Sequence, residues 1–263
     1  MSYRLCLIVA TLAIVLVATG CEPAGNNQGG GTGDKLTVTV SIDPQKYFLE
    51  RIGGDRVSVN VMVPPGADPH TYEPKPEQLK ALGRSVAYFS IGVEFEKAWL
   101  NKIAAANPKM TIVDTTQNIQ RIPSADYAHN GQISGQPRGE NLDPHIWLSP
   151  RLVKVQSQTI YEALVRLDSG HEAIYRANLD SFTADIDALD AEIRSALDGA
   201  ANRKFMVFHP SWGYFARDYG LEMIAIEVGG QEPSAAELAA LISEAKQDGI
   251  KVVFAQPELS SRA

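Results

Sequence analysis

Apolar and polar positions alternate with two different periods along most of the chain. Short runs such as LTVTVSI (36–42) and VSVNVMV (57–63) have the composition of β-strands, and each is followed by a stretch with helical spacing. Strands are predicted at 36–42, 57–63, 86–92 and 110–114, with helices at 44–54, 75–83 and 96–106. Because strand and helix alternate, this region is predicted to form a parallel sheet flanked by helices.

A long helical stretch follows. From 149 to 197 the sequence contains few helix breakers apart from Gly170. Its second half places one apolar stripe on one helix face, made of Leu179, Phe182, Ile186, Leu189, Ile193 and Leu197. A helix over 172–197 would extend roughly 40 Å. A coiled-coil partner would explain the stripe, but a buried, rigid backbone helix that joins two lobes explains it better.

Strand and helix patterns resume beyond residue 200. Strands are predicted at 204–209, 221–227 and 250–256, and helices at 212–220 and 234–249. The last strand, IKVVFAQ, reads as a buried parallel strand, and such strands normally have both faces covered. Only PELSSRA follows it, so the second lobe is expected to be incomplete. The predicted organisation is an N-terminal α/β lobe (35–148), linking helices (149–199) and a C-terminal α/β lobe (200–263).

The first 34 residues have a different composition. Arg4 precedes a short apolar run that ends in small residues before Cys21. This pattern is typical of a secretory signal, because a membrane span needs about 20 apolar residues. The ending resembles a bacterial lipobox, which implies that residues 1–20 are a signal peptide and that the Cys21 sulfur is lipidated. The Gly- and Asn-rich residues 21–34 then form a flexible tether on a membrane.

Charge and cysteine content narrow the chemistry. The 263 residues carry a formal net charge of -7 at pH 7, which argues against a nucleic-acid partner, since such a protein needs a basic face. The chain has two cysteines, and Cys6 would leave with the signal. The mature domain, expected to be a monomer, would therefore contain no disulfide and no thiolate ligand. Any metal site must use His, Asp or Glu.

Three histidines share a setting that suits a metal site. His70 follows a predicted strand in GADPHTYEP, His145 precedes the linking helix in LDPHIWLSP, and His209 ends the strand KFMVFH. Ligand sites in open α/β sheets form beyond the carboxyl ends of strands, and a proline beside each histidine restricts the local backbone. Three imidazoles suit a first-row divalent metal, above all zinc.

The other histidines lack this setting. His129 lies in the polar, Gly-rich segment 126–141, which is expected to be a mobile loop, and His171 reads as part of a solvent-exposed helix start. Neither is counted as a ligand.

The segments around the three histidines resemble a known family. VPPGADPHTYEPKPEQL, DPHIWLSPRLVK and VFHPSWGYFARDYGLEMIAIEVGGQEPSAAEL are similar to segments of the cluster A-I solute-binding lipoproteins, the zinc- and manganese-binding components of bacterial ABC importers. The resemblance implies two lobes joined by a rigid helix, with the metal between them on His70, His145 and His209. It also implies an extracytoplasmic, membrane-anchored protein, periplasmic or on the cell surface, that delivers metal to an ABC permease. Three imidazoles favour zinc, with manganese as the alternative.

Two features depart from the family pattern. Zinc-binding members often carry a long His- and Asp-rich loop before the second ligand, whereas segment 126–141 is short and contains a single histidine. The family's fourth ligand, a carboxylate, lies beyond the FAQPELSS-like segment, and the chain stops at Ala263 before that position. Water or a carboxylate such as Glu227 or Glu258 would then complete the site.

A zinc-dependent hydrolase is the rival reading, because three His and an open position also describe a catalytic zinc. Asp68 and Asp143 each precede a histidine by two residues and are possible bases, but Asp-Pro dipeptides also favour turns. Ser211 in HPSWG is not in a nucleophile elbow, and it is expected to cap a helix. A role in cell adhesion has no support beyond lipidation. The sequence therefore favours a binding protein, not an enzyme.

Overall fold

The computed structural model describes residues 35–69, 71–124, 142–227 and 232–256. Several predicted features lie outside the described residues: the signal peptide, the tether with Cys21, the predicted ligand His70, the segment 126–141 with His129, and Glu258. None of the described helices is both long and apolar enough to cross a membrane.

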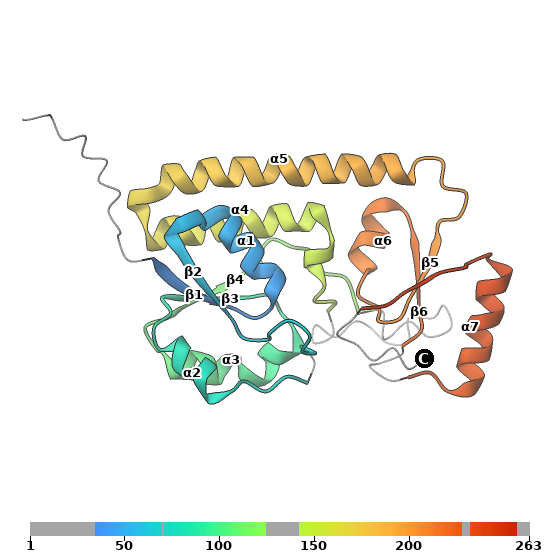
Figure 1. The fold of residues 1–263 in the computed structure, drawn as a ribbon, viewed down its shortest axis with the longest axis horizontal. Helices are drawn as coiled ribbons and strands as arrows, with labels where there is room; N and C mark the ends of the chain where they lie inside the picture. The colour runs from blue at the N-terminus through green and yellow to red at the C-terminus, as the bar shows by residue number, and fades with distance from the viewer. Residues whose placement is uncertain (1–34, 70, 125–141, 228–231, 257–263) are drawn as a thin grey trace, which may run out of the picture. The chain divides into compact units, whose positions relative to one another are not determined.

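The first lobe is built on a parallel sheet of four strands (Figure 1). The strands are β1 (Leu36–Val40), β2 (Val57–Val61), β3 (Ala87–Ser90) and β4 (Thr111–Asp114), in the order β2-β1-β3-β4. The helices between them are α1 (Asp43–Gly53), α2 (Pro76–Leu82) and α3 (Glu94–Ala106). In register, Val38 of β1 lies between Val59 and Ala87. The predicted alternation and the parallel sheet are confirmed.

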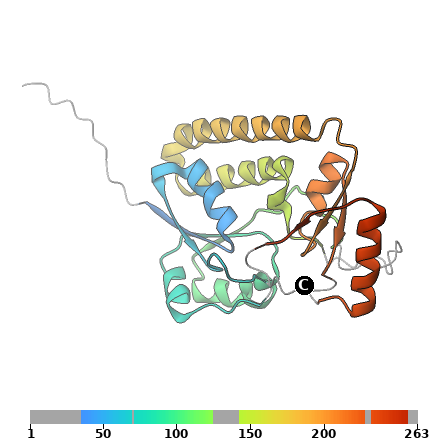
Figure 2. The ribbon, with the colours of Figure 1, turned by 45° about the vertical axis from the view of Figure 1, so that its right-hand side comes forward.

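Both faces of this sheet are buried. One face packs on α1 and the linking helices, through residues that include Val38, Leu49, Phe89, Ile160 and Phe182. The other face packs on α2 and α3, through residues that include Leu82, Tyr88, Phe95 and Ile103. Consecutive β3 residues thus enter opposite cores, as the period of two in a strand requires. Figure 2 shows the two helical layers on either side of the sheet.

Two helices, packed along each other, link the lobes. They are α4 (Pro150–Leu167) and α5 (Glu172–Leu197), separated by the short 3-10 turn η5 (Ser169–His171) at the predicted break. The expectation of a stripe buried along its whole length is only half right. Leu179, Phe182 and Ile186 are buried, whereas Leu189 is exposed, because the core of the first lobe packs against the first half of α5 only.

The second lobe has a parallel sheet of three strands in the order β6-β5-β7. Its elements are β5 (Lys204–Val207), α6 (Gly213–Tyr219), β6 (Glu222–Ala225), α7 (Ala235–Gln247) and β7 (Val253–Phe254). Its core is small, formed by Met206, Phe208, Ile224 and Ile226 with partly buried residues such as Leu241 of α7.

The prediction of a buried strand at 250–256 is wrong. Only Val253 and Phe254 form β7, and Val252, Val253 and Phe254 are 59%, 46% and 57% exposed. Within the described residues β7 pairs with β5 alone, and its side chains do not belong to the core of this lobe. Apolar composition identified the strand, but burial depends on what packs against it.

Candidate metal centre

Two of the three predicted ligands meet between the lobes. His209 follows β5 by two residues, and its neighbourhood is fixed by backbone bonds from Phe208 N to Phe254 O (2.8 Å) and from Glu227 N to Phe208 O (2.9 Å). His145 directly precedes the 3-10 helix η4 (Ile146–Leu148), which leads into α4. Both histidines are only 8% exposed. His209 therefore lies just beyond the carboxyl end of a strand, as predicted, and His145 lies at the start of the helical segment that leads into α4.

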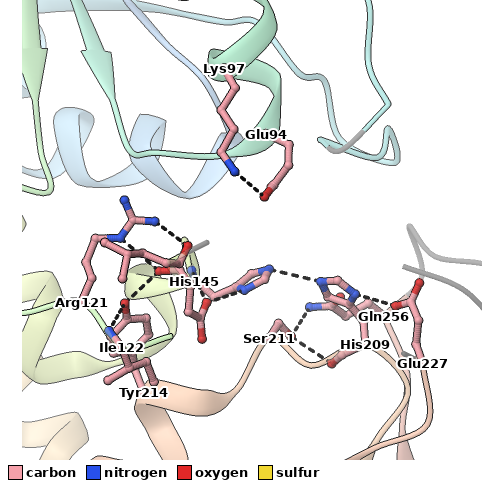
Figure 3. A network of polar contacts seen from close by, with 12 residues as sticks. Glu94, Lys97, Arg121, Ile122, His145, His209, Ser211, Tyr214, Glu227 and Gln256 are labelled. Carbon is pink, nitrogen blue, oxygen red and sulfur yellow. Dashed lines mark hydrogen bonds and ion pairs between the residues drawn. The ribbon is translucent and has the colours of Figure 1, made fainter. Parts of the chain in front are cut away.

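The two rings face each other through their Nε2 atoms, which lie 3.3 Å apart (Figure 3). Two nitrogen ligands of a tetrahedral zinc, each about 2.0–2.1 Å from the metal, are separated by roughly 3.3–3.4 Å. The observed separation is thus what two ligands of one zinc ion require.

A carboxylate holds the outer nitrogen of each ring. Asp143 Oδ1 lies 2.8 Å from His145 Nδ1, and Glu227 Oε2 lies 2.6 Å from His209 Nδ1. Since an ionised carboxylate only accepts hydrogen bonds, Nδ1 of each ring is the donor in these contacts, and Nε2 is the atom that faces the other histidine. Carboxylate-to-histidine bonds of this kind orient metal ligands.

Asp143 and Glu227 reach their histidines by different routes. Asp143 Oδ1 also accepts the backbone N–H of His145 at 2.8 Å, which confirms the predicted Asp-Pro turn. Glu227 comes from the end of β6, 18 residues from His209. Its bonded oxygen is on the ring nitrogen that faces away from His145, which favours an orienting role over the fourth-ligand role considered from the sequence.

A cavity of about 310 Å³ reaches both rings. Its wall includes Trp147 beside His145 and the proline-rich segment Pro64, Pro65 and Pro69. Pro69, which directly precedes His70 in the sequence, lines this cavity. His70 itself lies outside the described residues. Among those residues no group of three or more His, Cys, Asp or Glu side chains could hold a metal ion.

The remaining sequence candidates lie elsewhere or act otherwise. His171 Nδ1 lies 2.8 Å from Asp168 Oδ1 at the turn between the linking helices. Asp68 accepts a hydrogen bond from the Thr71 hydroxyl at 3.1 Å, as expected for a turn. The prediction that Ser211 caps a helix is wrong, because α6 begins at Gly213 and the Ser211 hydroxyl instead accepts a bond from Gln256 Nε2 at 3.0 Å.

The orienting role of both carboxylates was missed from the sequence. The two-residue spacing in Asp143-Pro-His145 was a signal that could have indicated it, because an Asx turn places the carboxylate beside the following residues. For Glu227 no local signal exists, since its contact with His209 depends on the pairing of β5 with β6.

Comparisons with known proteins show metal-binding relatives of this chain. The chain is 27% identical over 264 residues to the high-affinity zinc uptake system protein ZnuA of Bacillus subtilis, which covers 97% of this chain and 82% of that protein. It is 25% identical over 259 residues to the manganese-binding lipoprotein MntA of Halalkalibacterium halodurans, covering 96% of this chain and 81% of that protein.

A solved structure is similar as well. The crystal structure of a ZnuA deletion mutant with zinc bound superposes with a TM-score of 0.78 and 48% identity, covering 87% of this chain and 84% of that one. The family model for the zinc-uptake complex component A periplasmic protein matches residues 38–263. The chain therefore belongs to the zinc-uptake complex component A family, whose members are the metal-binding components of metal uptake systems.

Proposed function

We propose that this protein captures a zinc ion outside the cytoplasm on His70, His145 and His209 and delivers it to the permease of an ABC importer. The observation that carries the proposal is the pair of Nε2 atoms 3.3 Å apart, one from each lobe. His70, the residue after the cavity-lining Pro69, would supply the third imidazole, and water is the simplest fourth ligand.

The charge of the site supports a divalent cation. A zinc ion held by three neutral imidazoles would keep its charge of 2+. A buried charge without compensation is unfavourable where the dielectric is low. Asp143 and Glu227 together supply two negative charges through the rings they contact. A divalent metal bound there would be neutralised by its immediate surroundings.

The same contacts favour a carrier over a hydrolase. A catalytic zinc needs a base that can reach the metal-bound water. Asp143 and Glu227 each use an oxygen to bond the outer nitrogen of a histidine ring, and Asp143 is 1% exposed. Neither carboxylate is placed to receive a proton from a water on the Nε2 side.

The choice between zinc and manganese follows from the ligand atoms. Nitrogen ligands bind zinc more tightly than manganese, because manganese has the lowest affinity in the Irving–Williams order. The site, with its imidazoles, therefore favours zinc, and manganese is the alternative. Elemental analysis of protein purified without added metal would decide between them.

The test of the site is a competition titration with a chromophoric zinc chelator. His70→Ala, His145→Ala and His209→Ala should each weaken zinc binding at least tenfold, or about 1.4 kcal/mol. His129→Ala and His171→Ala are the controls and should change little. Equal and small effects at all five positions would exclude this site, and hydrolase activity of the zinc-loaded protein would exclude a pure carrier.

We also propose that the mature chain is a monomer held on the membrane by lipid on Cys21. Cys21→Ser should release the protein from the membrane fraction without changing its zinc affinity, because the anchor would act only on location. A loss of affinity in this variant would mean that the N-terminal segment contributes to the site.

A further inference from the structure

Helix α6 belongs to the second lobe in sequence but is anchored in the first. Its residue Tyr214 is completely buried, and its ring is part of the core cluster that also contains Tyr88, Phe95 and Ile146. A second contact comes from the Ser149 hydroxyl, at the start of α4, which donates to Asp218 Oδ2 at 2.5 Å. The segment from His209 into α6 is thus attached to the first lobe through Tyr214 and to the start of the linking helix α4 through Asp218.

The Tyr214 hydroxyl joins two chain segments that flank residues 125–141. It donates to the carbonyl of Asp143 at 2.8 Å and accepts from the backbone N–H of Ile122 at 3.2 Å (Figure 3). The two segments also bond to each other, from Asp143 N to Ile122 O at 2.9 Å. Arg121 adds a bond from Nε to the same Asp143 carbonyl at 3.2 Å. Asp143 is therefore fixed through its backbone.

This backbone attachment matters because the Asp143 carboxylate has little else to hold it. Oδ1 accepts both bonds from His145, while Oδ2 is buried without a hydrogen-bond partner among the described residues. The packing around it is close: a Cβ on Gly213 would come within 2.9 Å of Oδ2. The direction of the carboxylate, and with it the direction of the His145 ring, depends on where the Asp143 backbone lies.

We propose that Tyr214 is a positioning residue of the metal centre, whose hydroxyl fixes Asp143, and through it His145, against the lobe that carries His209. The proposal rests on the proposed function as a zinc-binding protein. Burial raises the pKa of the Tyr214 phenol, so the hydroxyl keeps its proton at physiological pH. It can then donate to Asp143 and accept from Ile122 at the same time.

The same helix provides a matched control. The Tyr219 hydroxyl donates to Asp190 Oδ1 of α5 at 2.7 Å, with no contact to Asp143 or to either histidine. Tyr214→Phe and Tyr219→Phe therefore remove the same group from the same helix. If α6 only stabilises the fold, the two variants should bind zinc equally well.

The first measurement is zinc affinity by chelator competition, with thermal unfolding of the metal-free proteins to check folding. Tyr214→Phe should bind zinc about three- to tenfold more weakly, as expected for the loss of one or two net hydrogen bonds that act on the site. It should also alter the visible absorption of the Co²⁺-substituted protein, which reports ligand geometry. Tyr219→Phe should stay within about twofold of the parent and keep its Co²⁺ spectrum.

The second measurement is a double-mutant cycle with Asp143→Asn. If Tyr214 acts through Asp143, the losses in zinc affinity are not additive, whereas independent effects would add. Additive losses, or a Tyr214→Phe variant that binds zinc like the parent with an unchanged Co²⁺ spectrum, would overturn the positioning role. Should Tyr214→Phe not fold, Arg121→Met removes another bond to the same carbonyl and carries the same expectation.

The outcomes separate this inference from the function on which it rests. If the parent protein does not bind zinc, or if His145→Ala binds it as tightly as the parent, the proposed function fails. If the parent binds zinc through His145 and only the Tyr214 results are negative, the positioning role fails alone.

Discussion

The two lobes bring equal parts to the centre but are built very differently. Each supplies one described histidine and one carboxylate on its outer nitrogen. In the first lobe the sheet is buried on both faces by two large apolar clusters. In the second lobe the core cluster has four buried residues, and the edge strand β7 is exposed.

This difference shows where the rigidity of the site comes from. His145 stands on a lobe with a deep core, whereas His209 follows a strand whose own core is small. The position of His209 relative to His145 is therefore maintained by the docking of α6, through Tyr214 and Asp218, rather than by packing within the second lobe. The following predictions test that contrast, from the largest expected effect to the smallest.

Core truncation should affect the two lobes very unequally. Leu49→Ala removes a fully buried side chain from the first lobe and should lower the free energy of unfolding by about 2–5 kcal/mol through the cavity it leaves. Phe254→Ala removes a side chain that is 57% exposed and should cost no more than about 0.5 kcal/mol. Urea unfolding measures both. Similar losses would mean that β7 is as deeply packed as the first sheet.

Zinc should stabilise the whole protein and reduce the contrast between the lobes. At a free zinc concentration one hundred times Kd, the free energy of unfolding should rise by about 2.7 kcal/mol. Because His209 follows β5, amide exchange at Met206 and Val207 should slow more than at Val38 and Val40. Removal of zinc by a chelator should reverse both changes. Equal protection in both sheets would show that the second lobe is already rigid without metal.

The two orienting carboxylates should matter equally although they belong to different lobes. Asp143→Asn and Glu227→Gln keep a hydrogen-bond acceptor but remove a charge, and each should weaken zinc binding about 10- to 100-fold. Asp187→Asn is the control, since Asp187 is 59% exposed and pairs with Lys154. If only one of the two variants lost zinc affinity, the proposed charge compensation would act through one histidine and not through both.

The smallest effect is expected at the turn between the linking helices, far in sequence from either histidine of the site. Burial alone would raise the pKa of Asp168, but hydrogen bonds from Tyr175 and His171 and the nearby charge of Arg56 together lower it. A carboxyl with a lowered pKa contributes stability above its unfolded pKa of about 3.9, and this contribution is lost as pH falls through the folded pKa.

Asp168→Asn should therefore reduce stability at neutral pH by about 1 kcal/mol and make the unfolding free energy less dependent on pH in the acid range. Zinc affinity at neutral pH should not change. A loss of zinc affinity would show that the linking helices transmit strain to the centre. Urea unfolding between pH 3 and pH 7, with one zinc titration, would measure all three quantities.

Much of the fold could be predicted from the pattern of apolar residues alone. Every described strand and every described α-helix coincides with a predicted one. The reason is that the spacing of apolar residues differs between strands and helices, so it indicates which element can bury them on one face. The break between α4 and α5 was also predicted, at Gly170. The position of His145 and His209 at the ends of elements follows from the same pattern.

The contacts that complete the site are of two kinds, between residues close in sequence and between residues far apart in sequence. The bond from Asp143 to His145 spans two residues and follows from local turn chemistry. Glu227 lies 18 residues from His209, while Tyr214 lies 71 residues from Asp143 and 92 from Ile122. The sequence by itself determined the elements and the candidate ligands, because both depend on neighbouring residues. Only the tertiary structure decided which carboxylate orients His209, which helix ties the lobes together and which apolar strand is exposed, because these depend on how separate elements pack.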